Sequence, residues 1–548
     1  MATDAAVQRA AAGGVLLTLA SAQFLMTLDS SVMNVSMATV ASDVGTTITG
    51  IQTAITLYTL VMATLMITGG KIGTIIGRRR AFSIGCVIYG AGSLTTGLAP
   101  NLPVLIFGWS FLEGVGAALI MPAIVALVAS NFAQPDRPRA YGLVAAAGAI
   151  AVAVGPLLGG AATTYGSWRW VFFGEVGVVL VILALSRRVA DAPPEGPARL
   201  DVVGTLLSVV GLGMAVYGVL RSSEWGWLLP KEGGPALFGL SPTFWFVLTG
   251  LFVVWLLVRW ENRVAQRGGE PLVRPGMLRN PQLAAGLTMF GFQFLLQAGI
   301  FFVVPLFLSV VLELSAIETG LRILPLSLAL LVAAIGVPKL RPNASPRRVV
   351  RAGMLLILAG ILVLLGGITL DSSAAVVAVP MLLVGLGIGA LASQLGSVTV
   401  SSVPDEQSGE VGGLQNTATN LGASLGTALA GSVLITVLTT TLIAGIQDNP
   451  DVPDDVKQQA SVELASGVPF LSDTALEQAM GDAGESEDVT QSVLEDNREA
   501  RIRGLDAALA VLALLAIVSL FFTAQIPTRQ PGSPEAEAAA AGPEERAA

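Results

Sequence analysis

The chain has 548 residues, of which 53% are hydrophobic and only 12% are charged. Soluble domains carry about 25% charged residues, so this composition excludes a large soluble protein and predicts a membrane protein with many spans. The net charge of −8 says little about partners, because the acidic residues cluster in one loop and in the tail. With no histidine and a single cysteine, Cys86, the chain has neither an intramolecular disulfide nor a cysteine zinc site. Any proton relay must therefore use carboxyl groups.

Fourteen segments are apolar enough to cross a bilayer, which takes about 20 residues each. They lie at 13–38, 51–69, 81–99, 102–130, 140–163, 168–187, 202–220, 243–259, 283–312, 320–338, 349–370, 374–399, 410–443 and 504–524. Residues 9–22 imitate a signal peptide, but the apolar run continues well beyond them, so we expect an uncleaved first helix. The two long segments, 283–312 and 410–443, are expected to include interfacial turns.

Lys and Arg residues are divided unevenly between the two sides of the predicted membrane. With the N-terminus inside, 22 of the 30 fall in cytoplasmic segments and eight fall outside. Because cytoplasmic loops carry the excess of Lys and Arg, we expect a multi-pass protein of the cell (inner or plasma) membrane with both termini in the cytoplasm.

An internal repeat is visible in the loops. The stretch 77–80 (Gly-Arg-Arg-Arg) between spans two and three matches 346–348 (Pro-Arg-Arg) between spans ten and eleven, provided that spans seven and eight are an insertion. The glycine-rich fifth span likewise matches the glycine-rich thirteenth. Two similar halves with a site between them are typical of transporters, whereas a channel or a membrane enzyme has no need of this layout.

These observations predict an all-α polytopic membrane protein with the following organisation. The expected parts are a cytoplasmic N-tail (1–12), a six-helix bundle (13–187), two inserted helices with cytoplasmic linkers (188–282), a second six-helix bundle (283–526) that includes an acidic extracellular loop (444–503), and a disordered tail (527–548).

The acidic loop, from about residue 447 to 500, carries fourteen acidic residues against Lys457 and Arg498. Residues 473–480 have the composition of a short helix. The loop is either a lid or a cation-attracting vestibule, or else only a solvated stretch. Runs of charge are usually solvated, which favours the last interpretation.

One acid interrupts the first span just past its midpoint, Asp29. A charged side chain at that depth is costly, and such residues usually face a cavity and serve the function. The alternative is a structural acid that serine, asparagine or backbone donors satisfy.

Glu113 and Glu175 lie in spans four and six, at a depth similar to that of Asp29, given a rise of about 1.5 Å per residue. The three carboxyl groups are therefore expected to face one cavity, where burial and mutual repulsion would let them gain and lose protons near neutral pH. There they could also pair with a lipophilic cation. For Glu113 the alternative is helix packing along the small residues that follow it, and for Glu175 it is an ion pair with Arg169.

No other chemistry is indicated. The chain has no Gly-x-x-x-x-Gly-Lys-Ser/Thr nucleotide motif and no Gly-x-Ser-x-Gly elbow. An enzyme is therefore not expected. What remains is transport driven by a gradient, with no cofactor and no metal.

Four motifs resemble those of the major facilitator superfamily and, within it, of the fourteen-helix drug:proton antiporters. Residues 28–35 (Leu-Asp-Ser-Ser-Val-Met-Asn-Val) look like the first-helix motif, and 155–160 (Gly-Pro-Leu-Leu-Gly-Gly) are similar to the antiporter motif of the fifth helix. Residues 168–173 resemble the Trp-Arg-Trp entry to the sixth helix, and 320–325 also resemble this branch. The resemblance implies two pseudo-symmetric six-helix bundles plus two inserted helices, fourteen in all.

Two groups of residues are expected to control the change of conformation. They are Lys71, Gly77, Arg78 and Arg79 around the loop after span two, and Gly155, Pro156, Gly159 and Gly160 in span five. We expect Arg78 and Arg79 to bind helix ends or acids of the opposite half. Thr74 stands where the family usually has an Asp, which leaves the usual charge clamp between the halves without its acid.

The expected function is export of lipophilic small molecules in exchange for protons by alternating access. Asp29 is the expected proton site, Glu113 and Glu175 share proton or substrate binding, and Asn34 joins the substrate site. Because both glutamates stand where the family usually has neutral residues, cationic substrates are expected. The alternative is export of one endogenous metabolite, such as an antibiotic, a lipid or a siderophore. We expect a monomer in the bilayer that handles small molecules and protons and does not bind nucleic acid.

Overall fold

The computed structural model of the chain describes residues 2–46, 48–191, 199–231, 234–449, 452, 457, 470–483 and 486–530. Within these residues every regular element is a helix, and the one β-bridge, between Leu237 and Leu240, is isolated. The prediction of an all-α protein is confirmed.

The helices have the following bounds. The first group is α1 (Ala2–Asp43), α2 (Ile48–Ile76), α3 (Arg78–Gly97), α4 (Leu102–Leu105), the π-helix η1 (Ile106–Glu113), α5 (Gly114–Asn131), η2 (Gln134–Asp136), α6 (Arg137–Tyr165) and α7 (Arg169–Ser186). The second is α8 (Val202–Trp225), α9 (Pro242–Gln266) and η3 (Pro275–Arg279). The third is α10 (Pro281–Leu306), the π-helix η4 (Phe307–Val311), α11 (Ala316–Leu340), α12 (Pro346–Gly367), η5 (Ala374–Val377), α13 (Ala378–Val400), η6 (Asp405–Gln407), α14 (Ser408–Asp448), α16 (Asp473–Ala483), α17 (Glu487–Phe522) and η7 (Thr523–Gln525).

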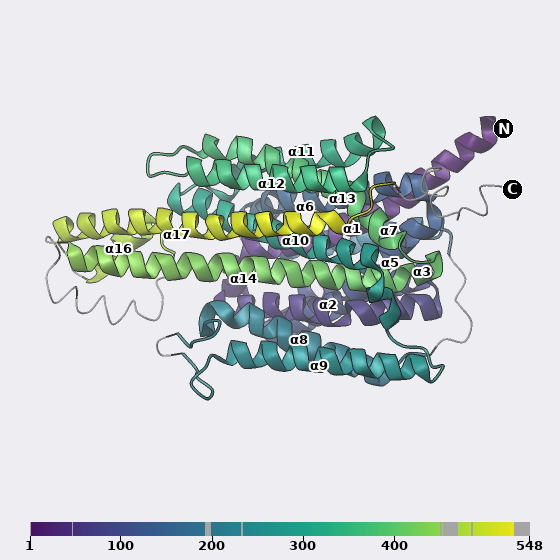
Figure 1. The fold of residues 1–548 in the computed structure, drawn as a ribbon. Coiled ribbons are helices and arrows are strands. Elements are labelled where there is room, and N and C mark those ends of the chain that lie inside the picture. Colours follow the sequence, from purple (N-terminus) through teal and green to yellow (C-terminus); the bar gives the residue numbers. More distant parts are fainter. Residues whose placement is uncertain are drawn as a thin grey trace.

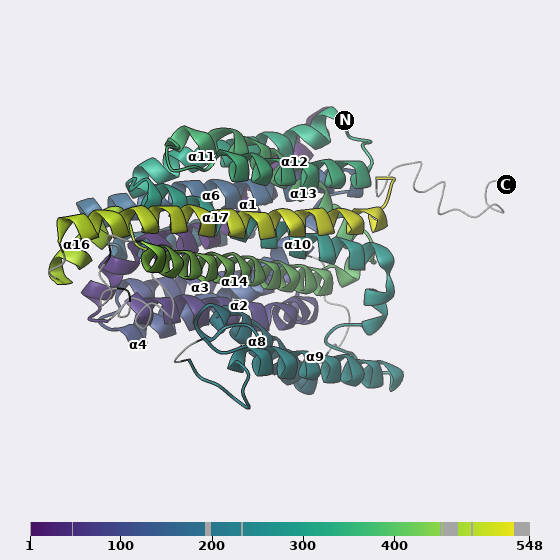
Figure 2. The ribbon, with the colours of Figure 1, turned by 60° about the vertical axis from the view of Figure 1, so that its left-hand side comes forward.

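The long helices run side by side along one direction (Figure 1). The start of α1 and the end of α17 lie at the same end of the bundle, called the terminal end below, and α16 lies at the opposite end. Helices α1–α7 form one half and α10–α17 the other. The hairpin of α8 and α9 packs outside them against α2 and α14, one helix from each half (Figure 2).

Thirteen helical segments of the described residues are long and apolar enough to cross a membrane. The fourteenth predicted span, 81–99, is α3, a 20-residue helix that begins with three arginines and packs against α5 and α7. Hydropathy is weaker there because α3 contributes glycine, serine and threonine to the interior of its half. The fourteen predicted spans therefore correspond to fourteen helical segments.

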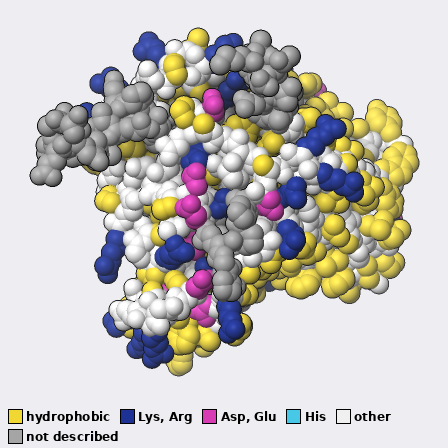
Figure 3. All heavy atoms as spheres, turned by 90° about the vertical axis from the view of Figure 1, so that its right-hand side faces the viewer, with side chains coloured by type: hydrophobic (Ala, Val, Ile, Leu, Met, Phe, Trp, Pro, Cys, Tyr) yellow, Lys and Arg dark blue, Asp and Glu magenta, His cyan; other side chains and the backbone are white. Residues whose placement is uncertain are grey.

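The surface suits a bilayer. Large apolar side chains are exposed along the flanks, as at Leu251, Phe252 and Trp255 of α9. Figure 3 looks onto the terminal end, where Lys and Arg side chains are numerous, while the adjoining flank is mostly hydrophobic. An apolar flank of this extent marks a surface that contacts lipid, and the basic end is the one for which the sequence predicts a cytoplasmic location.

The main difference from the sequence-based expectation concerns the segment after α14. That helix is continuous to Asp448, so the interfacial turn expected within 410–443 is absent, and α17 begins at Glu487 rather than near 504. Leu442 and Ile446 of α14 pack in one cluster with Val489 and Val493 of α17, so the two helices stay paired beyond their most apolar parts. The short helix expected at 473–480 is present as α16. Most of the predicted tail lies outside the described residues.

The internal repeat is visible in how the glycine-rich helices pack. A Cβ atom at Gly155 of α6 would lie 2.3 Å from Ser31 Oγ of α1, and a Cβ atom at Gly426 of α14 would lie 2.0 Å from the Leu295 carbonyl oxygen of α10. Both contacts are too short for any residue larger than glycine. Helix α6 therefore approaches α1 as α14 approaches α10, which is the correspondence that the sequence predicts for the two halves.

Candidate functional site

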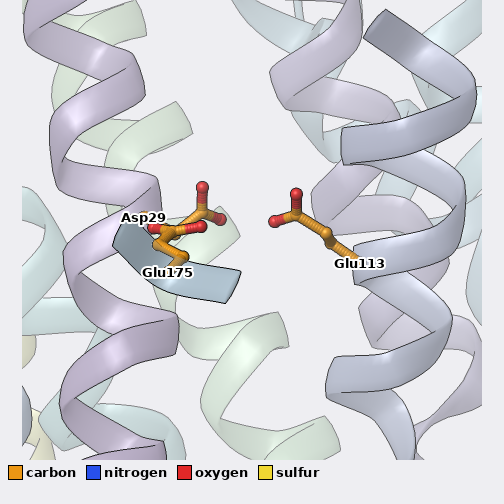
Figure 4. Close-up of side chains that lie close together, drawn as sticks. All are labelled: Asp29, Glu113 and Glu175. Carbon is orange, nitrogen blue, oxygen red and sulfur yellow. The ribbon is translucent and has the colours of Figure 1, made fainter. Parts of the chain in front are cut away.

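The three predicted acids meet inside the first half. Asp29 comes from α1, Glu113 from the last residue of η1 and Glu175 from α7, and one carboxyl oxygen of each lies within 4.8 Å of those of the other two. Figure 4 shows Glu113 pointing towards the other two from the opposite side. All three side chains are at most 2% exposed. We call these three residues the carboxyl cluster.

Asp29 is held by a tryptophan. The Trp109 indole N–H lies 2.8 Å from Asp29 Oδ1 and 2.9 Å from Oδ2, so it donates to the carboxyl group as a whole. The Trp109 ring stacks on Tyr58 of α2, with centroids 5.0 Å apart and planes within 3°. The donor is an indole N–H from another helix and not the serine, asparagine or backbone group that the alternative of a structural acid named.

The two glutamates are only partly satisfied. The Ser93 hydroxyl donates to Glu175 Oε2 at 3.1 Å, and the Thr96 hydroxyl donates to Glu113 Oε1 at 3.3 Å. The other oxygen of each glutamate is buried with no hydrogen-bond partner in the protein. A buried carboxyl oxygen without a donor is costly if the group is charged, so the cluster favours forms that carry fewer negative charges.

Trp109 and Glu113 both reach the cluster from a π-helix. Single π turns inside α-helices often occur at functional sites, and η1 carries Trp109 and Glu113 one turn apart. The facing helix α3 has Gly92 opposite, where a Cβ atom would lie 2.6 Å from Glu113 Cγ. Glycine at position 92 therefore makes the room that the Glu113 side chain occupies.

The structural alternative proposed for Glu175 is wrong. Arg169 Nη1 lies 2.8 Å from Asp43 Oδ2, and its Nη2 donates to the Ala99 carbonyl oxygen at 2.8 Å, so it is engaged away from the cluster. The alternative for Glu113 was helix packing along the small residues that follow it. Such packing is present next to Glu113, since a Cβ atom at Gly116 of α5 would lie 2.8 Å from the Gly85 carbonyl oxygen of α3. None of the ion pairs among the described residues includes a member of the carboxyl cluster. By spacing alone, the three oxygens are close enough to share a proton or one small cation.

A separate cavity lies between the two halves. It is lined by residues of α1, α5 and α6 from one half and of α10, α11, α13 and α14 from the other. Helix α1 contributes Gln23 and Thr27, which point away from Asp29 by about 120° and about 160° around the helix axis, at about 100° per residue. None of the three acids is among the described residues that line this cavity. The Asn34 side chain lies outside the described residues.

The halves are joined at the terminal end by charged groups. Lys71 Nζ of α2 lies 3.2 Å from Glu410 Oε1 of α14, and both side chains are 3% exposed. Arg137 of α6 pairs with Asp405 at 2.9 Å. Thr74 donates to the Lys71 carbonyl oxygen of its own helix at 2.8 Å. A lysine–glutamate pair thus crosses the interface near position 74, which carries no acid.

The two arginines of the loop after α2 differ in what they contact. Arg78 donates to the carbonyl oxygens of Asp405 and Glu406, at 2.7 and 2.9 Å, and so reaches the opposite half as expected. Arg79 stays within its own half, where its backbone N–H donates to Asp191 Oδ1 at 3.0 Å and its side chain to carbonyl oxygens after α7. Gly77 has φ +96°, a left-handed conformation that glycine adopts without strain.

The corresponding loop of the second half makes a contact like that of the Arg79 side chain. Arg347 Nε donates to the Ile526 carbonyl oxygen at 2.7 Å, beyond the end of α17. Arg79 therefore holds the end of the last helix of the first half, and Arg347 holds the end of the last helix of the second.

The glycine motif of α6 lies where that helix packs onto α1. Cβ atoms at Gly155 and Gly159 would meet Ser31 and Val32 of α1 at 2.3 and 3.2 Å, whereas Gly160 has open space around its Cβ position. The Pro156 side chain lies outside the described residues. Ser31 Oγ also donates to the Val152 carbonyl oxygen at 3.3 Å.

Several residues of these sites were missed from the sequence. Trp109 could have been found from the sequence, because it lies one helical turn before Glu113 and therefore on a similar side of its helix. The sequence could not indicate Glu410 and Asp405, since their partners Lys71 and Arg137 are more than 260 positions away in the chain.

The chain matches the family model of the Major Facilitator Superfamily over residues 19–427. It is 31% identical to the puromycin resistance protein Pur8 of Streptomyces alboniger, over 84% of this chain and 89% of that protein. It is 29% identical to the probable actinorhodin transporter of Streptomyces coelicolor, over 84% and 77%, and 27% identical to the multidrug resistance protein Stp of Mycobacterium tuberculosis, over 80% and 79%. The solved proton:xylose symporter XylE superposes with a TM-score of 0.56 at 13% identity, over 96% and 98% of the two chains, which shows a shared fold.

Proposed function

The chain belongs to the major facilitator superfamily, and we propose that it exports lipophilic small molecules in exchange for protons by alternating access. Its relatives are named as antibiotic and multidrug resistance or export proteins, which supports efflux. The observation that carries proton coupling is the carboxyl cluster. Burying an unpaired charge costs several kcal/mol, so three buried carboxyl groups this close, none of them in an ion pair among the described residues, favour a state in which at least one holds a proton. The cluster is therefore suited to hold and release at least one proton.

The same helix connects this proton site to the central cavity. Helix α1 carries Asp29 towards the cluster and Gln23 and Thr27 towards the cavity. Its contact with α6 through Gly155 leaves no free space on that side. A shift of α1 when the charge of the cluster changes would therefore be felt at the cavity wall. Coupling in this proposal is indirect, and proton and substrate do not compete for the same atoms.

A preference for cations remains a prediction from the sequence. It assumed that the acids face the substrate, and no described residue on the wall of the cavity is charged. The proposal therefore includes lipophilic substrates in general and does not require a positive charge.

Export of a single endogenous compound is the second candidate. The relative named as a probable actinorhodin transporter favours it, because its name refers to one compound, while the relative named for multidrug resistance favours broad export. A transport panel with unrelated compounds distinguishes the two.

We further propose that the terminal end faces the cytoplasm and that the protein acts as a monomer. Lys and Arg side chains on the face shown in Figure 3 support this orientation. In it, the end closed by Lys71 and Glu410 is the cytoplasmic one.

The test is transport in proteoliposomes with an imposed pH gradient. Asp29→Asn keeps an acceptor for Trp109 but cannot titrate, so gradient-driven export should be lost while substrate exchange without a gradient continues. Asp43→Asn is the matched control, because it removes a carboxylate from the same helix outside the cluster. Full gradient-driven export by Asp29→Asn would rule out Asp29 as the coupling residue.

A further inference from the structure

The polar groups on the wall of the central cavity are mainly side-chain amides. Glutamines and an asparagine from both halves face it: Gln23, Gln293, Gln297, Gln415 and Asn416. Between them lie apolar and aromatic side chains, including Phe290 and Phe294. Among the described residues that line this cavity there is no Lys, Arg, Asp or Glu.

Two of these amides have hydrogen-bonding capacity to spare. Gln293 of α10 and Gln415 of α14 are 3% and 6% exposed, and the Oε1 atom of each is buried with no partner in the protein. Buried polar atoms normally have partners. A side-chain amide both donates and accepts, so these two positions match ligand groups that do the same, such as hydroxyl or amide groups.

The hydroxyl groups on the same wall are already engaged. Thr27 donates to the Gln23 carbonyl oxygen at 3.0 Å, Thr419 to the Gln415 carbonyl oxygen at 2.9 Å, and Tyr141 to the Val125 carbonyl oxygen at 3.0 Å. These bonds run to the backbone within the protein. The glutamine side chains are therefore the groups best placed to recognise a ligand.

Charge decides between classes of ligand. A cation enclosed by apolar and amide groups loses hydration without gaining a counter-charge, which is unfavourable. The acids of the carboxyl cluster are not among the residues that line the cavity. An uncharged molecule that carries hydroxyl, carbonyl or amide groups loses less hydration free energy when it enters the cavity, and it can form hydrogen bonds with the side-chain amides.

We infer that the central cavity selects uncharged amphiphilic compounds, with an apolar ring system against Phe290 and Phe294 and hydrogen-bonding groups against Gln293 and Gln415. This inference rests on the proposed function, because it names the class of compound that the exporter carries. It makes the two glutamines the residues that determine specificity, and it separates substrate choice from the proton site.

The experiment measures equilibrium binding to the purified full-length protein without a pH gradient. The probes are chloramphenicol, which is uncharged and carries hydroxyl and amide groups, and tetraphenylphosphonium, a permanent cation with no hydrogen-bonding group. Wild type should bind chloramphenicol more tightly. Gln293→Leu and Gln415→Leu should each weaken chloramphenicol binding by roughly fivefold or more, as expected for losing one buried hydrogen bond, and should leave tetraphenylphosphonium binding unchanged or improved.

Two further variants sharpen the test. Gln415→Glu places a carboxylate on the wall and should raise the affinity for tetraphenylphosphonium. Gln394→Leu is the control, because Gln394 of α13 is also buried with an unpartnered Oε1 but does not line the cavity. Tighter binding of the cation by wild type, binding of neither probe, or equal loss of both probes in the leucine variants would overturn the inference.

Failure of this inference is distinguishable from failure of the proposed function. Binding selectivity is measured without a proton gradient, whereas proton coupling is measured by gradient-driven export in Asp29→Asn. A protein that prefers the cation but still loses gradient-driven export in that variant would disprove only the inference. A protein with the expected selectivity but no response to a pH gradient would disprove only the coupling.

Discussion

Lys71 and Glu410 form an ion pair across the two halves, with 3.2 Å between Nζ and Oε1 and only 3% of each side chain exposed. The backbones approach closely beside it, because a Cβ atom at Gly70 would lie 2.5 Å from the Gly409 carbonyl oxygen. The linker after α9 joins the pair, since the Arg274 backbone N–H donates to Glu410 Oε2 at 3.5 Å. The hairpin of α8 and α9 is thereby connected to the closed end of the transporter.

Removing one partner of this pair should open the terminal end. Glu410→Gln leaves the buried Lys71 amine without its partner, and Lys71→Met leaves Glu410 with only the more distant Arg274 guanidinium, whose Nε lies 4.0 Å from Oε1. Breaking a buried pair costs about 3–5 kcal/mol. The measurement is labelling of a cysteine at Thr27, in a Cys86→Ala background, by a thiol reagent added from the side of the terminal end. Labelling should rise in each single variant and fall again in Lys71→Met with Glu410→Leu, because an apolar pair restores the contact.

The control for that experiment is Arg503→Ala, which breaks an exposed pair with Glu499 at the other end of the molecule. Exposed ion pairs contribute only about 0–1 kcal/mol to the stability of a protein, so labelling should stay at the wild-type level. Unchanged labelling in both single variants of the buried pair would contradict its role as a clamp.

Variants of the two neighbouring arginines, Arg78 and Arg79, should give different results in the same assay. Arg78 donates two hydrogen bonds to carbonyl oxygens of the opposite half, whereas the hydrogen bonds of Arg79 within the described residues go to its own half. Arg78→Ala should therefore increase labelling from the terminal end, and Arg79→Ala should not. Equal shifts in the two variants would show that the loop acts as a whole and not through the Arg78 contacts.

At the opposite end, α16 is docked through Glu313, which lies in the segment between η4 and α11. The backbone N–H and the hydroxyl of Thr474 donate to Glu313, at 3.0 and 2.8 Å, and these hydrogen bonds lower the pKa of the Glu313 carboxyl group. A group whose pKa is lowered by folding stabilises the folded contact at neutral pH and loses that contribution as the pH falls through the lowered pKa.

We therefore expect α16 to loosen on acidification. Hydrogen exchange of residues 473–483 should accelerate as the pH is lowered, after correction for the intrinsic exchange rate. Glu313→Gln should show faster exchange already at neutral pH and a weaker dependence on pH. Glu318→Gln, which alters a nearby acid that caps α11, is the control. A pH dependence identical in all three proteins would exclude Glu313 as the sensor.

Much of the fold follows from hydropathy because a bilayer forces each crossing segment to satisfy its own backbone hydrogen bonds. The lengths of α14 and α17 do not follow, because beyond their apolar parts they are kept helical by pairing with each other, as between Ile446 and Val489. A sequence pattern marks where a helix is apolar and not where such a partner keeps it folded.

The candidate site was predictable to a similar degree. The rise per residue fixes the depth of an acid along its helix, so the meeting of Asp29, Glu113 and Glu175 could be expected. Which side of α1 the carboxyl group of Asp29 faces depends on how that helix is rotated against its neighbours, and α6 determines this through contacts far away in sequence. The separation of the acids from the cavity, which includes Gln293, therefore required the structure.

The contact between Gly155 and Ser31 offers a test of how α1 is held. A Cβ atom at Gly155 would lie 2.3 Å from Ser31 Oγ and 2.4 Å from Ser31 Cβ, so Gly155→Ala forces the two helices apart. Overpacking of this kind typically costs about 1–3 kcal/mol. We expect a lower melting temperature and weaker gradient-driven export, because displaced α1 carries both Asp29 and part of the cavity wall. Gly160→Ala, five residues along the same helix, has open space and should behave as wild type. Gly155→Ala combined with Ser31→Gly removes the clash and should recover both properties. If the single Gly155→Ala variant already matches wild type, α1 has more freedom than these contacts indicate, and coupling through its position would have to be abandoned.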